Sequence, residues 1–248
     1  MTIYKKTRLD QLLVDRGLAE TRSRAAELVR SGCVSVEGAP ALKPGVSVRP
    51  DAMLVLSPGA PTFVSRGALK LEAGLEAFAL EAEGRVALDL GASTGGFTEV
   101  LLAHGAAKVY AVDVGRDQLH ARLRAHPRVV ALQETDARHL SGAIVKEAVG
   151  AIVADVSFIS LTLALPAALA LAAPDAWLVA LVKPQFEAGR QAVGKGGVVR
   201  SEAAREKAVT RVWQFLEAAG WKVEGVVPSP IRGRGGNVEF LIGARHGC

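Results

Sequence analysis

Two lysines and two acidic residues stand at positions where charge is unusual for a packed domain. Lys183 closes an otherwise apolar run, Asp155 ends another, and Glu239 falls in the last apolar run of the chain. Lys70 lies on a predicted helix that precedes these runs. Because a buried ammonium group needs anionic partners, we expect the four side chains to meet in one site. Such a group could activate a hydroxyl, with Lys183 as general base and the carboxylates orienting the amines, or it could form two structural ion pairs.

A glycine-rich turn follows the strand predicted for Val86–Leu90, and a helix is expected after it. Glycines let the backbone approach a ligand, and ligands of open parallel sheets bind beyond the carboxyl ends of the strands. Asp113 ends the second strand about 20 residues later, where a carboxylate can bind two ribose hydroxyls. Asp136 follows the third strand and could bind an adenine amino group, although both aspartates could instead cap helices or face water. The residues predicted to bind the ligand are Asp89, Gly91, Ala92, Ser93, Gly95, Gly96, Phe97, Asp113 and Asp136.

The same turn is compatible with two other chemistries. Its residues 91–95 satisfy the G-x-S-x-G pattern of the hydrolase nucleophile elbow, which would make Ser93 a nucleophile. A hydrolase also needs a later acid and histidine, and His246 lies in a polar tail, so this interpretation is weak. A dinucleotide site is less favoured than an S-adenosylmethionine site, because Ser93 replaces the second glycine of the G-x-G-x-x-G fingerprint.

Alternating strand and helix signals are expected to position these residues. Short β-rich runs are predicted at Val86–Leu90, Lys108–Val112, Val129–Gln133, Ala151–Ala154 and Trp177–Val182. Helix-length stretches separate them, which is typical of a mostly parallel sheet with helices on its faces. The apolar stretch Ile159–Ala173 is predicted to be a buried helix, because it is too short to cross a bilayer and contains Pro166.

The N-terminal residues have a different texture, with short helical and strand signals. A helix is predicted over Arg8–Gly17, and a second is expected between its N-cap Thr21 and Gly32. A hairpin follows, and further strand is predicted over Val46–Leu56. Breaker residues after Ser57 then predict a linker over 58–63, between a small domain of residues 1–57 and an α/β domain of residues 64–248.

Basic side chains give the N-terminal domain a possible partner. A net charge of +5 favours a polyanion, and arginines on one helix suit the phosphates of an RNA backbone. A solvated basic face is the alternative interpretation. The residues predicted to bind RNA are Arg8, Arg22, Arg24, Arg30, Lys43 and Arg66.

The composition indicates which cellular location and which kinds of stabilising site to expect for this protein. Half of the 248 residues are hydrophobic, which is enough for a substantial core. We expect a cytoplasmic protein without a membrane partner, because no apolar run follows the basic N-terminus and no stretch is long enough to span a bilayer. Two cysteines and no His/Cys cluster predict neither a disulfide framework nor a metal site.

Several blocks of the sequence resemble known families. The motifs from Arg8 to Lys43-Pro44 resemble the alpha-L RNA-binding domain, and residues 89–98 resemble the first S-adenosylmethionine motif of ribose methyltransferases. The order lysine, aspartate, lysine, glutamate resembles the tetrad of FtsJ-like methyltransferases. With the blocks at 64–67, 91–97, 154–160, 182–187 and 236–239, nearly the whole chain resembles the TlyA family, often labelled hemolysin A. Ala68 and Leu69 depart from the family pattern beside Lys70.

This resemblance implies a fold, a cofactor and a reaction. The fold would be a Rossmann-like methyltransferase sheet with flanking helices, preceded by a small α+β alpha-L domain. The activity would be methyl transfer from S-adenosylmethionine to a ribose 2′-hydroxyl, with cytidine in ribosomal RNA as substrate and ribosomal RNA or ribosomal subunits as partner. Two other functions stay open: a hemolysin-like membrane-active protein, and a non-catalytic RNA-binding protein with a relic cofactor fold.

Overall fold

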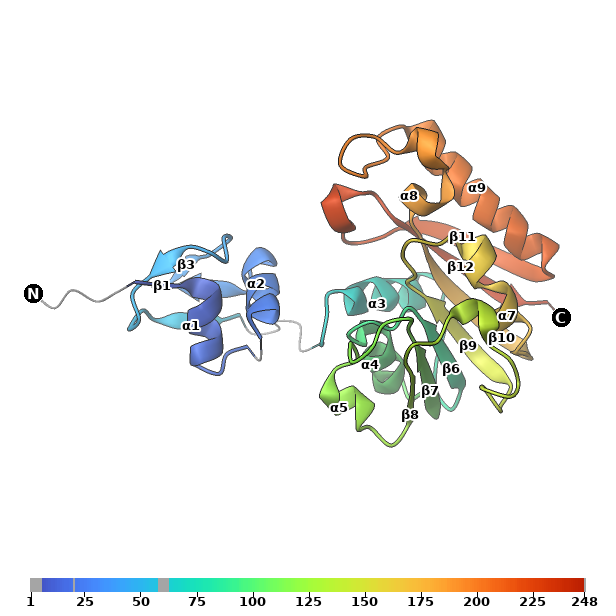
Figure 1. Cartoon of the computed structure of the whole chain (residues 1–248), viewed down its shortest axis with the longest axis horizontal. Coiled ribbons are helices and arrows are strands. Elements are labelled where there is room, and N and C mark those ends of the chain that lie inside the picture. Colours follow the sequence, from blue (N-terminus) through green and yellow to red (C-terminus); the bar gives the residue numbers. More distant parts are fainter. Residues whose placement is uncertain (1–5, 20, 58–62, 248) are drawn as a thin grey trace, which may run out of the picture. The chain divides into compact units, whose positions relative to one another are not determined.

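A computed structural model of the chain describes residues 6–19, 21–57 and 63–247. It divides the chain into two compact units, Met1–Arg66 and Gly67–Cys248, and each unit is described by itself (Figure 1). The linker predicted over 58–63 lies outside the described residues except for Phe63.

The N-terminal unit packs two helices against short strands. Its elements are β1 (Thr7–Arg8), α1 (Leu9–Asp15), α2 (Arg22–Arg30), β2 (Val34–Val36), β3 (Ala39–Pro40), β4 (Ser47–Val48) and β5 (Leu54–Leu56). Strand β2 pairs with β3 and β5, and β1 pairs with β4. Thr21 caps α2 as expected, because its hydroxyl accepts a hydrogen bond from the backbone N–H of Arg24 at 3.2 Å. The further strand expected within Val46–Leu56 is present as two strands, β4 and β5, which a turn at Pro50 separates.

The second unit is built on a seven-stranded sheet. Its strands are β6 (Val86–Leu90), β7 (Lys108–Val112), β8 (Val129–Leu132), β9 (Val149–Ala154), β10 (Ala172–Val182), β11 (Trp221–Pro228) and β12 (Phe240–His246). They lie in the order β11-β12-β10-β9-β6-β7-β8. The strands from β10 to β8 in this order are mutually parallel, while β12 is antiparallel to both β10 and β11. This is the mostly parallel α/β sheet that the alternation of signals predicted.

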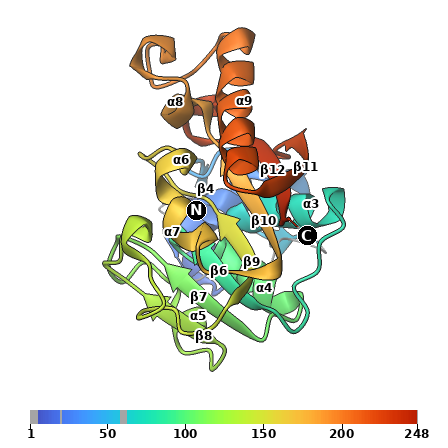
Figure 2. The same cartoon turned by 90° about the vertical axis from the view of Figure 1, so that its right-hand side faces the viewer.

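Helices cover both faces of the sheet (Figure 2). They are α3 (Gly67–Ala77), α4 (Gly96–Ala103), α5 (Ala121–Arg124), α6 (Leu161–Ala164), α7 (Pro166–Leu169), α8 (Pro184–Glu187) and α9 (Glu202–Ala218), with short 3-10 turns at Ala137–His139, Arg190–Ala192 and Arg234–Gly236. Leu161 of α6, Leu169 of α7 and Leu216 of α9 join the core formed with alternate strand residues. The single helix predicted over Ile159–Ala173 is wrong, because Pro166 begins a new helix and Ala172 already belongs to β10.

The strand order fixes where a ligand can bind. Chain order runs outward from β6 through β7 to β8 on one side, and from β9 through β10 on the other. The order therefore reverses between β6 and β9, and crevices at such reversals bind ligands beyond the carboxyl ends of the strands. Gly91 follows β6 and Asp155 follows β9, so both lie at this point.

Within the part of the chain that the structure describes, no helix combines the length and the apolar character needed to cross a membrane.

Candidate active site

Lys183 and Asp155 form an ion pair at the carboxyl ends of neighbouring parallel strands. Lys183 directly follows β10, which ends there because Pro184 starts α8 and has no backbone N–H for the sheet. Its Nζ lies 2.6 Å from Asp155 Oδ1 and donates a hydrogen bond to Ser157 Oγ at 2.8 Å. The Lys183 side chain is 10% exposed and that of Asp155 is 23% exposed. The amine is thus held on one side by protein oxygens, in a pair that solvent and ligands can reach.

Lys70 and Glu239 form a second and deeper pair. Lys70 Nζ lies 2.7 Å from Glu239 Oε2, and the Glu239 side chain is only 2% exposed. Helix α3, which carries Lys70, approaches the sheet closely at Gly74: a Cβ atom there would lie 2.9 Å from Val179 Cγ1. Glu239 was expected within the last strand but lies one residue before β12.

Strand pairing brings the two ion pairs together. In the antiparallel ladder between β10 and β12, Val182 pairs with Phe240. The next residues outward, Lys183 and Glu239, therefore leave the ladder at the same edge of the sheet. All four charged residues that the sequence singled out converge at one end of the sheet as two lysine–carboxylate pairs.

The glycine turn lies against the Asp155 segment. Gly91 has φ of +79°, and a Cβ atom there would lie 2.8 Å from the Asp155 carbonyl oxygen. The backbone N–H of Asp155 donates to the Leu90 carbonyl at 2.9 Å, which joins the two segments just before they separate. Only glycine fits this conformation and this close approach. The predicted ligand turn and the Lys183–Asp155 pair are therefore neighbours.

Asp113 supports the turn from the end of the next strand. Its Oδ2 accepts a hydrogen bond from the backbone N–H of Ser93 at 2.8 Å, and its Oδ1 accepts one from the N–H of Gly115 at 2.7 Å. Ser93 has φ of +47°, a conformation that few side chains adopt. Each carboxylate oxygen keeps a further lone pair, so Asp113 can fix the turn and still accept from a ligand hydroxyl.

Asp89 is a buried carboxyl without a cation. It is 0% exposed; its Oδ2 accepts a hydrogen bond from the Thr98 hydroxyl at 2.6 Å, and its Oδ1 has no hydrogen-bond partner. The pKa of Asp89 is raised to about 7, chiefly by burial; the hydrogen bond from Thr98 opposes this shift, and the negative charges of Asp155 and Asp113 contribute to it.

Asp136 has a local structural task. Its carboxylate accepts from the backbone N–H of Arg138 at 2.9 Å, capping the turn Ala137–His139, and forms an ion pair with the Arg138 guanidinium. These hydrogen bonds lower the pKa of Asp136 to about 2. The capping role that the sequence left open is therefore present, and a role in adenine binding stays a prediction.

The remaining turn residues contribute mainly through their backbone. Ala92 and Phe97 are buried at 6% and 3% exposure, and Gly96 begins α4. Gly95 precedes that helix. A Cβ atom on Gly95 would clash with the side chains of Leu119 and Leu123.

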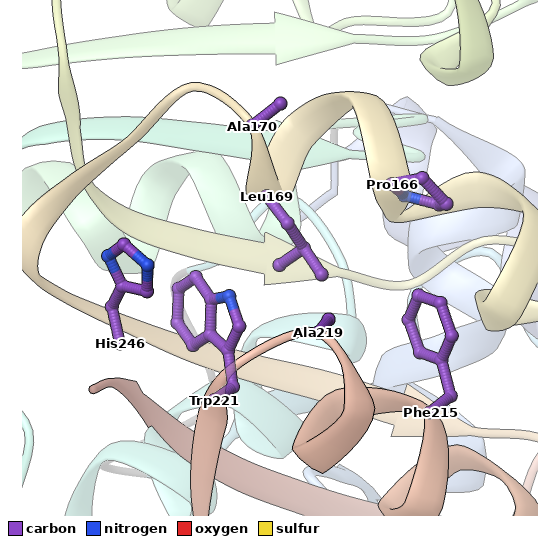
Figure 3. A pocket seen from close by; sticks show the side chains of 7 residues that line it. All are labelled: Pro166, Leu169, Ala170, Phe215, Ala219, Trp221 and His246. Carbon is purple, nitrogen blue, oxygen red and sulfur yellow. The ribbon is translucent and has the colours of Figure 1, made fainter.

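The hydrolase alternative fails on geometry. Ser93 Oγ lies 3.3 Å from Gln118 Oε1, and His246 ends β12 at the opposite end of that strand from Glu239. His246 stacks on Trp221 with ring centroids 5.1 Å apart. The two rings line a shallow apolar pocket of about 260 Å³ together with residues of α7 and α9 (Figure 3). A nucleophile–histidine pair between Ser93 and His246 is thus excluded.

Two neighbours of the Lys183–Asp155 pair were not singled out from the sequence. Ser157 holds Lys183, as described above, and Phe158 exposes 86% of its surface in a left-handed backbone conformation with φ of +67°. The Phe158 ring lies 5.4 Å from the ring of Phe186, measured between centroids. An exposed aromatic residue with a strained backbone is uncommon in proteins, and such residues occur mainly at functional surfaces. In the sequence, Phe158 is indistinguishable from a core residue.

Buried polar side chains fix the loops around the site. Glu187, 3% exposed, accepts from the Ser160 hydroxyl at 2.6 Å and from the backbone N–H of Leu161 at 2.7 Å. Asn237, also 3% exposed, accepts from the N–H of Val199 and donates to the carbonyl of Gly197. The glycine-rich loop before α9 is thereby tied to the segment that carries Glu239.

The residues predicted to bind RNA have surface positions in the N-terminal unit. Arg8, Arg22, Arg30, Lys43 and Arg66 are exposed, and Arg24 is partly buried. Arg8 and Arg22 share a carboxylate, Asp10, as described below. The role of these residues in RNA binding stays a prediction.

Comparison with known proteins gives the family of both units. Residues 63–246 match the model of the FtsJ-like methyltransferases, and residues 7–54 match that of the S4 domain, another name for the alpha-L RNA-binding domain. The 16S/23S rRNA (cytidine-2′-O)-methyltransferase TlyA of Mycobacterium tuberculosis is 48% identical over 97% of this chain and 90% of its own length. Hemolysin A of Brachyspira hyodysenteriae is 37% identical over 94% of this chain and 98% of its own length.

Solved structures give the same result. A candidate hemolysin from Streptococcus thermophilus is 41% identical and covers 98% of this chain and 89% of its own, with a TM-score of 0.77. The recognised motifs, the two-unit architecture and these relatives agree. The chain belongs to the TlyA family of FtsJ-like methyltransferases.

Proposed function

We propose that this protein methylates a ribose 2′-hydroxyl in ribosomal RNA, with cytidine as the modified nucleoside. The observation that carries the proposal is the contact between Gly91 and the Asp155 backbone, which sets the Lys183–Asp155 pair directly beside the glycine turn. The proposed cofactor site and the proposed base are thus contiguous. The printed name of the M. tuberculosis relative supports the reaction and the nucleoside.

The turn suits S-adenosylmethionine. Gly91 lets the turn pack directly against the Asp155 backbone, and Asp113, which follows β7, is available to ribose hydroxyls. Asp155, which follows β9 and is partly exposed, adds negative charge beside the turn, which suits a cationic ligand. When bound, the cofactor supplies a methyl group already activated as a sulfonium.

Lys183 is proposed as the general base. A ribose hydroxyl is a poor nucleophile, so its proton must leave as its oxygen bonds to the methyl carbon and the carbon–sulfur bond breaks. For this step Lys183 must first release to solvent the proton that it carries in the ion pair with Asp155. Its neutral Nζ then accepts the hydroxyl proton and becomes an ammonium group again, so the positive charge lost from the sulfonium reappears on Lys183. Asp155, 2.6 Å away, stabilises this ammonium, and the Ser157 hydroxyl accepts one of its hydrogen bonds.

RNA recognition is proposed to use both units. The exposed arginines of the N-terminal unit suit phosphates, and the Phe158 ring beside Ser157 suits stacking on an unpaired base. Such a substrate would be met in the cytoplasm, where ribosomes are assembled.

The direct test combines the purified protein, labelled S-adenosylmethionine and ribosomal subunits or their RNA. We expect methyl transfer, and nucleoside mass spectrometry is expected to find 2′-O-methylcytidine. Label at another nucleoside would correct the base; label on a base rather than a ribose would reject the reaction. No transfer together with millimolar cofactor affinity would favour an RNA-binding protein with a relic fold, and leakage of liposomes would favour a membrane-active protein.

A further inference from the structure

The N-terminal unit contains one buried carboxylate that holds two exposed arginines. Asp10 is 4% exposed, although it lies in the first turn of α1 on the surface of a small domain. Arg8 Nε donates to Asp10 Oδ1 at 2.9 Å, and Arg8 Nη2 donates to Oδ2 at 2.7 Å. Arg22 Nη2, from the start of α2, reaches the same Oδ2 at 3.5 Å. One carboxylate therefore fixes guanidinium groups from two separate elements.

The two arginines keep donors for another partner. Their side chains are 54% and 55% exposed, whereas that of Asp10 is 6% exposed. A guanidinium carries five N–H donors, and Arg8 gives only two of them to Asp10. The exposed guanidinium groups of Arg8 and Arg22 are thus held in place by the buried Asp10 carboxylate.

The backbone around the cluster is built to hold it. The backbone N–H of Asp10 donates to the Pro44 carbonyl at 2.9 Å. A Cβ atom on Gly45 would lie 3.0 to 3.2 Å from three atoms of the Arg8 guanidinium, so Gly45 leaves the space in which that group lies. Lys43, a further exposed cation, belongs to the same loop.

We propose that Asp10 is a positioning residue for RNA binding: it orients Arg8 and Arg22 so that their free donors meet neighbouring phosphates of one RNA backbone. The inference rests on the proposed function, because it takes RNA as the ligand. A guanidinium group that is already oriented can bind a phosphate through two hydrogen bonds, and its side chain loses little conformational entropy on binding.

Charge and positioning make opposite predictions for this residue. If only net charge mattered, removing the Asp10 carboxylate would tighten RNA binding, because repulsion of phosphates would fall. If Asp10 positions the arginines, its removal weakens binding although the protein becomes more basic. Asp15, exposed on the same helix and bonded only to Gln11 among the contacts the structure gives it, offers a matched control for the charge change.

The experiment measures binding of purified ribosomal RNA to the full chain and its Asp10→Asn, Asp15→Asn and Arg8→Lys variants over a range of KCl concentrations. For Asp10→Asn we expect the Kd to rise about tenfold and the salt slope to fall by about one, as for the loss of one phosphate contact. Arg8→Lys keeps the charge but loses the fork, and should weaken binding similarly. Asp15→Asn should bind at least as tightly as wild type.

Three outcomes would overturn the proposal. Asp10→Asn binding as tightly as Asp15→Asn would show that only charge matters. A loss of affinity in Asp10→Asn with an unfolded N-terminal unit by circular dichroism, but no loss in a folded Arg8→Lys protein, would make Asp10 merely structural. Absence of RNA binding by the wild type would reject the proposed function itself, whereas the first two outcomes leave it standing.

Discussion

The two lysine–carboxylate pairs of the site have similar lengths and different surroundings. Lys70–Glu239, at 2.7 Å, is sealed between α3 and the start of β12, with Glu239 2% exposed. Lys183–Asp155, at 2.6 Å, leaves Asp155 23% exposed beside the glycine turn. The two lysine side chains are equally exposed, at 10% each, so the pairs differ in how far solvent and ligands reach their carboxylates. From this difference in carboxylate burial we expect Lys70–Glu239 to be the supporting pair and Lys183–Asp155 the reacting pair.

Asp89 extends this comparison to a buried carboxyl that has no cationic partner among the contacts that the structure gives it. It lies in the same region and is as deeply buried as Glu239, but no lysine or arginine pairs with it among the contacts that the structure gives it. Without a cation, burial raises its pKa to about 7. Asp89 is therefore a buried carboxyl whose protonation changes near neutral pH, and it offers a separate test of what burial does at this end of the sheet.

The largest effect on stability is expected when one partner of the Lys70–Glu239 pair loses its charge. Glu239→Gln leaves Lys70 buried without its counter-charge, which should lower the free energy of unfolding by about 4 kcal/mol. The double variant Lys70→Met with Glu239→Leu should lose much less, because neither charge remains. Urea denaturation of the three proteins measures this, and equal losses in the single and double variants would refute the supporting role.

Asp89→Asn should change how stability depends on pH. A carboxyl whose pKa is higher in the folded than in the unfolded chain binds more protons when folded, so its contribution to stability falls as pH rises from about 4 to about 7. The asparagine variant lacks this loss and should gain on the order of 3 kcal/mol relative to wild type between pH 4 and pH 8. Urea midpoints across this range test it; a constant difference between the two proteins would contradict it.

Asp155→Asn should preserve the fold and slow the reaction. The pair is partly exposed, and the amide still accepts a hydrogen bond from Lys183. The ammonium formed by proton transfer would lose its counter-charge, so methyl transfer to ribosomal RNA should fall about 100-fold. Single-turnover rates and the thermal midpoint measure both quantities. A strongly lowered midpoint would place this pair with the supporting one.

The smallest effect is expected at Ser157. Ser157→Ala removes one of the hydrogen bonds of Lys183 Nζ, worth about tenfold in rate, whereas Ser157→Thr keeps the hydroxyl and should recover part of the activity. Equal rates in the wild type and the alanine variant would show that Asp155 alone positions the amine.

The sequence predicted the contact between Lys183 and Asp155 better than it predicted the residues around this pair. Lys183 could be found because a lysine between an apolar strand and a proline must have a partner, and parallel strand ends put that partner on Asp155. Strands β6 and β7 fall where their apolar runs predicted them. Periodicity over short runs is enough for such elements.

What escaped prediction depends on contacts between distant segments. The left-handed backbone at Phe158 exposes an aromatic ring that hydropathy assigns to the core. The two arginines held by Asp10 are joined only when α2 packs against α1, so the sequence showed a basic face but not its buried anion. The stretch from Ile159 was misassigned because a proline inside an apolar run can start a helix as well as interrupt one.

The most direct test of the account is the single-turnover rate of Lys183→Ala on ribosomal RNA, at a cofactor concentration that calorimetry shows to be saturating. The account predicts that S-adenosylmethionine binds with nearly wild-type affinity, while methyl transfer falls by at least about 1,000-fold. A rate within tenfold of wild type, with the fold intact, would show that Lys183 is not the base and would contradict the division between the two pairs.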